Sequence, residues 1–302
     1  MERSQPRMSE YDYQYGKFAV RVREIQCKSA LTPTCGFLGL SYTHSLNPYN
    51  GCLFGNGGCG IYCYAQKVYP AISKHPGEGW GSWVDVKVNA AEVLRSDLGK
   101  ARRKGEVIIY MSSITDPFQP LESRYGISKA CLLEMDRQPP DALVLQTRSP
   151  SVIEVFGLLK RISNKGTNLS LNITIETDDE EMRKRLMPVN PGIQSRLELC
   201  RSARSQGIFT QVTVSPMLPS NPKRFAELLD AVADRVIVDT FFLGDGSKGS
   251  RSMHLPVYQM LNEMGEGRLF EPIAHQELLE TFRQVLGEER VLLSRYGFNT
   301  LD

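Results

Sequence analysis

The chain has 302 residues, of which 41% are hydrophobic, and its 36 Lys and Arg residues nearly balance its 34 Asp and Glu residues. This is the composition of a globular protein that can bury a sizeable core, and the small net charge argues neither for nor against nucleic acid as a partner. There is no apolar run of about 20 residues and no apolar signal core, so we expect no membrane span or membrane partner and a cytoplasmic location.

In chain order, residues 1–35 are expected to be an irregular lead-in, and a glycine-rich loop follows at 47–66. Short apolar runs then alternate with stretches whose apolar residues recur at helical spacing, which predicts a parallel sheet or barrel. The Gly- and Ser-rich segment 243–256 is expected to be a loop, either mobile or facing a substrate. The predicted strands are 106–112, 142–147, 169–177, 208–219, 235–242 and 290–296, and the predicted helices are 88–105, 123–138, 149–163, 178–187, 194–207, 221–234 and 275–289.

The loop NPYNGCLFGNGGCGIYCYAQ, residues 47–66, carries Cys52, Cys59 and Cys63. Clustered cysteines in a cytosolic protein are more often metal ligands than disulfides, and an odd total of seven fits a disulfide framework poorly. Three thiolates do not complete a tetrahedral zinc site, whereas a [4Fe-4S] cluster held by three cysteines leaves one iron open to S-adenosylmethionine. The other reading is a glycine-rich turn with incidental cysteines.

This loop resembles the cluster loop of radical S-adenosylmethionine (SAM) enzymes of the spore photoproduct lyase-like group, in which NPYxGC and YCYA elements recur. Two departures are visible: the spacing here is Cx6Cx3C rather than CxxxCxxC, and YMSSITD lacks the hydrogen-donor cysteine of the lyase. Cys35 lies upstream of the loop, and we do not assign it as a ligand. Similar segments in the expected order are SALTPT (29–34), SSITDPFQPLESRYGISKACLLEM (112–135), LQTRSPSVIEVFGLL (145–159), LNITIETDDEEMRKRLMPVNPGIQSRLELCRSARSQGI (171–208) and VTVSPMLP (212–219).

The resemblance implies an α/β fold, a partial (β/α)6 TIM-like barrel of the radical SAM type with the cluster loop at the C-terminal edge of its strands. The core would span residues 36–245, and a C-terminal loop and helix, 246–302, would complete the barrel. The implied enzyme binds a [4Fe-4S] cluster and reductively cleaves SAM to a 5′-deoxyadenosyl radical that abstracts hydrogen from an unknown substrate. Lyase-like repair of DNA is one version of this activity. The alternatives are a non-catalytic iron–sulfur protein and a zinc-binding nucleic-acid module.

The resemblance also implies an external electron donor, such as flavodoxin or ferredoxin, and roles for single residues. Tyr62 would contact the adenine of SAM through its backbone, or simply pack. Ser112 and Ser113 would bind the amino group of the methionine moiety, or cap the next turn. Arg148 would bind the carboxylate of SAM, since a guanidinium matches a carboxylate in geometry; otherwise it is solvated surface. Tyr64 is a candidate catalytic hydrogen donor, or packs under the loop.

Three polar residues alternate along one predicted strand and therefore share one face: Asn172, Thr174 and Glu176. The resemblance implies that this face contacts the ribose hydroxyls of SAM, and the other reading is a buried polar network. Three more polar residues could either fix the segment after the first strand or touch the substrate: Asp116, Gln119 and Glu122.

Overall fold

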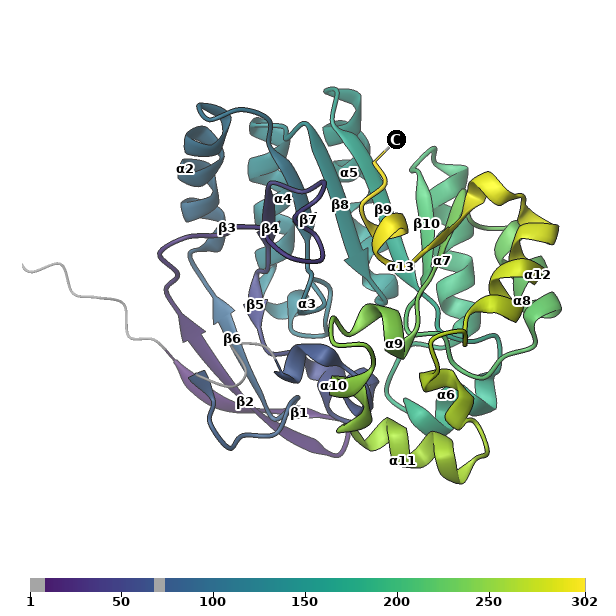
Figure 1. Cartoon of the computed structure of the whole chain (residues 1–302). Coiled ribbons are helices and arrows are strands. Elements are labelled where there is room, and N and C mark those ends of the chain that lie inside the picture. Colours follow the sequence, from purple (N-terminus) through teal and green to yellow (C-terminus); the bar gives the residue numbers. More distant parts are fainter. Residues whose placement is uncertain (1–8, 68–73, 302) are drawn as a thin grey trace, which may run out of the picture.

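A computed structural model describes residues 9–67 and 74–301, and its centre is an eight-stranded sheet (Figure 1). The strand order is β3-β4-β7-β8-β9-β10-β11-β12, in which only the β3–β4 pair is antiparallel. The predicted α/β class and parallel sheet are therefore confirmed. The strands are β3 (Leu31–Pro33), β4 (His44–Leu46), β7 (Ile108–Met111), β8 (Ala142–Thr147), β9 (Asn168–Thr174), β10 (Thr210–Val214), β11 (Arg235–Val238) and β12 (Val291–Leu293).

The longer helices lie along the outer side of the sheet (Figure 1), where α2 packs on α4, α4 on α5 and α8 on α12. Their apolar faces meet in the core, as the edge-to-face contact of Phe225 with Phe282 shows at a ring separation of 5.4 Å. The helices are α2 (Ala90–Arg102), α3 (Glu122–Tyr125), α4 (Ile127–Arg137), α5 (Phe156–Asn164), α6 (Glu180–Leu186), α7 (Ile193–Ser205), α8 (Pro222–Asp230), α9 (Phe241–Gly244), α10 (Ser250–Met253), α11 (Pro256–Glu263), α12 (Gln276–Leu286) and α13 (Ser294–Phe298).

Most of the predicted elements are present, with several differences. The predicted helix 123–138 is divided at Gly126 into α3 and α4, and the predicted strand 290–296 ends at Leu293, where α13 follows. The predicted helix 149–163 begins as a 3-10 helix, η4 (Pro150–Val155), before α5. The predicted strand 235–242 ends at Val238, because α9 begins at Phe241. The predicted loop 243–256 contains the short helix α10.

A second, four-stranded sheet has the order β1-β2-β6-β5. It is formed by β1 (Glu10–Tyr15), β2 (Phe18–Ile25), β6 (Trp83–Lys87) and β5 (Tyr49–Asn50). The described part of the segment 1–35, which we expected to be irregular, thus holds an antiparallel pair of strands. Burial of β1 alternates residue by residue, because one face packs on the core and the other meets solvent. Since β5 ends two residues before Cys52, this sheet anchors the start of the cysteine loop.

The main sheet is open, because no strand pairing in the described residues joins β3 to β12. Loops bridge these two edges instead: the Tyr42 hydroxyl donates to the carbonyl of Phe298 at 2.6 Å, and Arg295 donates to the carbonyl of Gly36 at 2.9 Å. Closure of a barrel by strands is therefore not seen. None of the helices in the described ranges has the length and apolar character needed to cross a bilayer.

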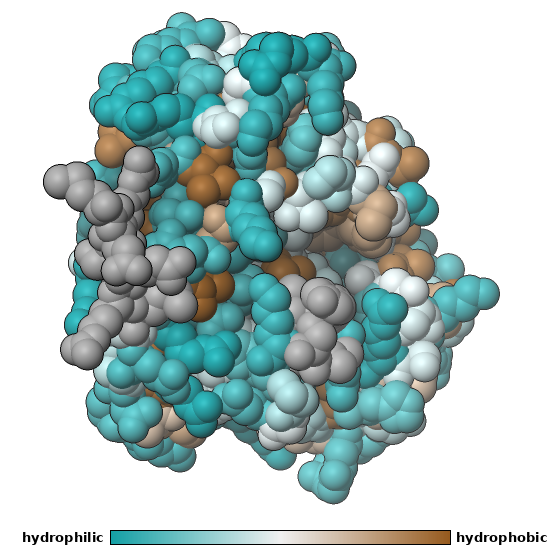
Figure 2. All heavy atoms as spheres, turned by 90° about the vertical axis from the view of Figure 1, so that its left-hand side faces the viewer, coloured by the Kyte–Doolittle hydropathy of each residue, from teal (hydrophilic) through white to brown (hydrophobic). Residues whose placement is uncertain are grey.

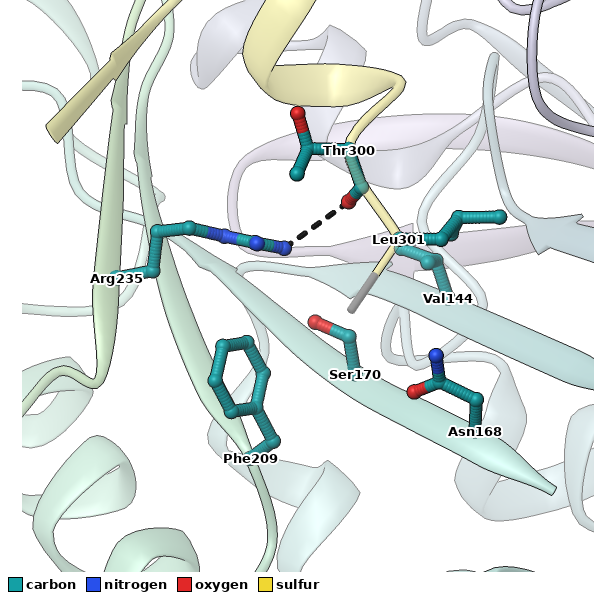
Figure 3. A pocket seen from close by; sticks show the side chains of 7 residues that line it. All are labelled: Val144, Asn168, Ser170, Phe209, Arg235, Thr300 and Leu301. Atoms are coloured by element: carbon teal, nitrogen blue, oxygen red, sulfur yellow. Dashed lines mark hydrogen bonds between the residues drawn. The ribbon is translucent and has the colours of Figure 1, made fainter. Parts of the chain in front are cut away.

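The chain's last described residues cover the N-terminal ends of β9, β10 and β11 (Figure 3). A pocket of about 250 Å³ lies there, lined by Phe209, Thr300 and Leu301 among others. Arg235 donates to the carbonyl of Thr300 at 3.0 Å, so this end of the sheet is held by the C-terminal segment. The opposite, C-terminal ends of the strands border a larger cavity.

Candidate functional site

A cavity of about 1100 Å³ lies at the C-terminal ends of the parallel strands. Its lining includes the residues that follow β4, β7, β8 and β11, namely Asn47, Ser112, Arg148 and Asp239. Ligands of open α/β sheets bind outside the carboxyl ends of the strands, so this is the expected position for a site. Figure 2 views the molecule from the side of β2, β3 and β6, and shows apolar side chains recessed among hydrophilic ones.

All three cysteines predicted as ligands line this cavity. They sit at the starts of three short 3-10 turns, η1 (Leu53–Gly55), η2 (Cys59–Ile61) and η3 (Tyr64–Lys67), and none of them forms a disulfide. Burial raises the pKa of Cys52, whereas a hydrogen bond with the thiol of Cys63 lowers the pKa of Cys59. The loop thus presents to one cavity the thiol of Cys59, whose pKa is lowered, and the thiols of Cys52 and Cys63, whose pKa values are raised.

The donor set of three thiols on one cavity is suited to an iron–sulfur cluster. In residues 9–67 and 74–301, no three His, Cys, Asp or Glu side chains lie close enough together to hold one metal ion. A zinc ion needs all of its ligands at bonding distance from one point, whereas each cysteine of a four-iron cluster binds a different iron. Three thiols that line one cavity can each meet a different iron of such a cluster.

The cysteine loop is packed so tightly that several of its glycines have no space for a side chain, as two of them illustrate. A Cβ on Gly51, which has φ +75°, would lie 2.4 Å from the carbonyl oxygen of Trp83 in β6. A Cβ on Gly60 would lie 1.7 Å from the carbonyl oxygen of Gly55 within the loop. These positions require glycine because the backbone of the loop folds onto itself and onto the second sheet.

The three polar residues of segment 116–122 have mainly backbone partners, and of the three only Asp116 lines the cavity. Gln119 is fully buried, accepts a hydrogen bond from the amide of Leu53 at 2.8 Å and donates to the carbonyl of Gly51 at 3.5 Å. Its amide thus holds the chain on both sides of Cys52. Asp116 accepts from the backbone amide of Arg148 at 2.9 Å, and Glu122 accepts from the amide of Ser128 at 3.0 Å. These contacts favour the loop-fixing reading.

Arg148 lies in a buried group of charges beside the cavity. Its guanidinium pairs with Glu176, whose other carboxylate oxygen lies 2.7 Å from Nη1 of Arg196. The hydroxyl of Tyr62 donates to Glu176 at 2.7 Å. Burial alone would raise the pKa of Glu176, but Arg148 and Arg196 lower it to about 2. Two guanidinium groups on one carboxylate leave a net positive charge. Next to its hydrogen bond with Cys63, the charge of Arg148 lowers the pKa of Cys59, whereas the charge of Glu176 raises it.

Ser112 and Thr115 carry buried, unpartnered hydroxyls beside the cavity. Both residues contribute to the lining, and neither hydroxyl oxygen has a hydrogen-bond partner in the described residues. Ser112 also has φ +75°, a conformation that side chains other than glycine adopt at a cost. Unpaired buried hydroxyls are expensive unless a ligand meets them. The carbonyl of Ser113, another lining residue, accepts the hydroxyl of Tyr64.

Of the three residues predicted to share a face of β9, only Thr174 lines the cavity. Its hydroxyl oxygen accepts a hydrogen bond from Gln146 at 2.6 Å. Asn172 accepts from Ser170 at 2.9 Å and lies outside the lining, as does Glu176. This is the arrangement of a buried polar network next to the cavity.

Sequence reasoning missed Arg196 and Thr115. Arg196 is fully buried, yet it occurs in a helix with two other arginines that are exposed, so nothing in the local pattern distinguishes it. Thr115 is the first residue of the TDPFQP segment and lies three residues after Ser112. This closeness in sequence to a predicted binding residue could have identified it.

No family model matches the chain. An uncharacterized protein of Methanocaldococcus jannaschii is 27% identical over 200 residues, which cover 66% of this chain and 69% of that protein. An uncharacterized protein of Mycobacterium tuberculosis is 27% identical over 206 residues, covering 66% and 57%. A radical SAM Nalpha-GlyT isomerase of Pseudomonas phage M6 is 27% identical over 200 residues, covering 64% and 38%. The chain thus spans between about two fifths and seven tenths of the length of these relatives.

Solved structures of spore photoproduct lyase share the fold. The lyase complexed with dinucleoside spore photoproduct aligns with a TM-score of 0.58 at 14% identity, over 90% of this chain and 81% of that chain. A mutant lyase with bound AdoMet and dinucleoside spore photoproduct aligns with a TM-score of 0.52 at 12% identity, over 83% and 76%. The chain therefore has the fold of spore photoproduct lyase, which is the fold that the resemblance seen in the sequence implied.

Proposed function

We propose that this chain is a radical SAM enzyme whose [4Fe-4S] cluster is held by Cys52, Cys59 and Cys63. The observation that carries the proposal is the convergence of these three thiols on one cavity at the C-terminal edge of the sheet. When bound, the cluster would supply an electron to SAM, whose cleavage yields methionine and a 5′-deoxyadenosyl radical. In this proposal the open sheet is a partial (β/α)6 barrel with its core at 36–245, and the segment 246–302 completes it.

The residues around the cysteine loop would hold SAM and exclude water. The net positive charge around Arg148 suits the carboxylate of SAM, and the unpartnered hydroxyl of Ser112 suits its amino group. Thr174 would meet the ribose from the cavity wall. Tyr62, which also lines the cavity, would contact the adenine of SAM through its backbone. Behind the lining, Asn172 and Glu176 would hold the binding groups in place, and the backbone of Ser113 would border the site.

Anaerobic reconstitution with iron and sulfide, followed by reduction with dithionite, tests this proposal. We expect roughly four irons per chain and slow release of methionine and 5′-deoxyadenosine even without substrate. Bound zinc in place of iron would instead support a zinc module. A cluster without any cleavage of SAM would support a non-catalytic iron–sulfur protein.

Arg148→Ala should weaken the binding of SAM, because a charge-assisted hydrogen bond of about 1.5–3 kcal/mol is lost. Equilibrium dialysis with reconstituted protein measures this as a rise of about 10- to 150-fold in Kd. Arg161→Ala is the matched control, since Arg161 is 55% exposed and pairs with Asp136 on the outer surface. Equal affinity in the wild type and the Arg148 variant would limit Arg148 to holding Glu176.

Tyr64→Phe tests the proposed hydrogen donor. Tyr64 follows Cys63 directly, lines the cavity and is 39% exposed. Phenylalanine keeps the ring and removes only the hydroxyl, so iron content should not change. If Tyr64 donates hydrogen, product formation should fall while release of 5′-deoxyadenosine persists. Wild-type turnover in this variant would leave Tyr64 with the packing role, consistent with its hydrogen bond to Ser113.

DNA or a DNA-derived molecule is the substrate class that we propose, because neighbours of the same fold bind dinucleoside spore photoproduct. The lining of the cavity includes two exposed lysines, Lys28 and Lys74, whose charges suit phosphates. Dinucleoside spore photoproduct is the first compound to test. A flavodoxin or ferredoxin would supply electrons, and the cytoplasm would be the location.

A further inference from the structure

One carboxylate in the cavity has no role in the site described so far. Asp239 follows β11, lines the cavity and is only 4% exposed. It accepts hydrogen bonds from the amide of Thr240 at 2.9 Å and the hydroxyl of Ser215 at 3.2 Å. No Arg, Lys or His within the described ranges forms an ion pair with it. By contrast, the buried carboxylates of Glu176 and Asp178 each pair with arginine.

The surrounding backbone is shaped around this carboxylate. A Cβ on Gly244 would lie 2.2 Å from Oδ2 of Asp239, so a larger residue there would displace it. Ser294, which donates a hydrogen bond to Asp239, has φ +42°. Backbone strain that surrounds a single polar group is a common feature of functional sites.

The charged and titratable groups that face Asp239 do not offset its negative charge. Burial raises the pKa of Asp239 to about 6, and the nearby carboxylate of Asp245, after α9, raises it as well. Tyr64 in η3 also interacts electrostatically with Asp239. A buried carboxylate without a cationic partner lowers the stability of the fold. A ligand that donates a hydrogen bond to this carboxylate would offset the loss of stability.

The proposed SAM site takes up one half of the cavity and leaves the other half free for a substrate. Residues after β7 and β8 are those we propose for SAM, and Ser215 and Asp239 after β10 and β11 remain for the other reactant. We propose that Asp239 is a substrate-binding residue whose carboxylate accepts a hydrogen bond from an N–H or O–H group of the substrate. This assignment rests on the proposed function, because it presumes that SAM occupies the other half.

The experiment compares Asp239→Asn with the wild type and with the control Asp230→Asn, a partly exposed acid that pairs with Arg290. In reconstituted protein, Kd for SAM and substrate-free release of 5′-deoxyadenosine should stay within twofold of the wild type. Binding of dinucleoside spore photoproduct, measured by calorimetry, should weaken at least tenfold. A tenfold loss of SAM affinity would move Asp239 to the cofactor site, and unchanged binding of the dinucleoside would also overturn the proposal.

Thermal unfolding of the metal-free protein gives a readout that needs neither the cluster nor the dinucleoside. Because the pKa of Asp239 is higher in the folded chain than in the unfolded one, its ionisation above pH 6 opposes folding. Asp239→Asn should therefore unfold at the same or a higher temperature than the wild type at pH 8. A lower unfolding temperature would make Asp239 a structural residue and overturn the proposal, even if the wild type binds no dinucleoside. Absence of SAM cleavage by the wild type would instead count against the proposed function.

Discussion

Alanine at Cys52, Cys59 or Cys63 is expected to abolish the iron–sulfur cluster. Each thiolate would bind a different iron, so the two that remain cannot hold a four-iron cluster at the site. Iron and sulfide determination after anaerobic reconstitution should give roughly four irons per wild-type chain and close to none for each variant. The oxygen-sensitive brown colour should disappear with the iron.

Cys35 is the matched control, because it is an exposed free thiol that lines the same cavity. Cys35→Ala should retain the full iron content. A Cys35 variant that alone loses the cluster would show that the ligand set is wrong. A fully buried thiol such as Cys200 should be equally dispensable for iron.

Glu176→Gln should destabilise the fold by about 3–5 kcal/mol, the usual cost of removing one partner from a buried ion pair. The change leaves Arg148 and the fully buried Arg196 without their shared carboxylate. Urea denaturation of the metal-free protein measures the difference. Glu181→Gln is the control: Glu181 pairs with Lys184, its side chain is 84% exposed, and its loss should change stability by no more than about 0.5 kcal/mol.

The same carboxylate predicts an acid-sensitive part of the stability. The folded pKa of Glu176 is lowered from 4.5 to about 2, so its contribution is complete above pH 4.5 and is lost as the pH falls towards 2. That contribution amounts to roughly 3 kcal/mol. Glu176→Gln should lack this part of the acid response. An acid response equal to that of the wild type, or a loss of stability below about 1 kcal/mol, would show that solvent already screens the arginines.

Much of the parallel sheet could be predicted because its strands are buried on both faces and therefore read as continuous apolar runs. ALVLQT forms β8 with the predicted bounds, and RVIV forms β11. The prediction of an irregular segment at residues 1–35 was wrong although the sequence contained a strand pattern. Tyr11, Tyr13 and Tyr15 alternate with polar residues in β1, which is the period of a half-buried strand. A resemblance that begins at residue 29 gave no support for strands before it.

The cysteine set of the candidate site could be predicted because its residues are adjacent in sequence. Contacts between distant residues could not. Arg196 reaches Glu176 from α7, and Gln119 reaches Leu53 across 66 positions. Nothing local distinguishes such a glutamine or arginine from one on the surface, since only the fold determines which side of the helix or turn faces the cavity. Asp239 could not be identified from the sequence for the same reason.

The crowding around Gly51 and Gly60 has a consequence for how the protein acquires its metal. Ordering a loop costs about 1–2 kcal/mol of conformational entropy per residue. In this chain the loop is fixed by the second sheet and by Gln119. The loop therefore loses its conformational entropy when the protein folds, before any metal binds. Small metal domains that lack such support unfold when the metal is removed. This chain should instead stay folded after oxygen destroys its cluster, and should accept a new one without refolding.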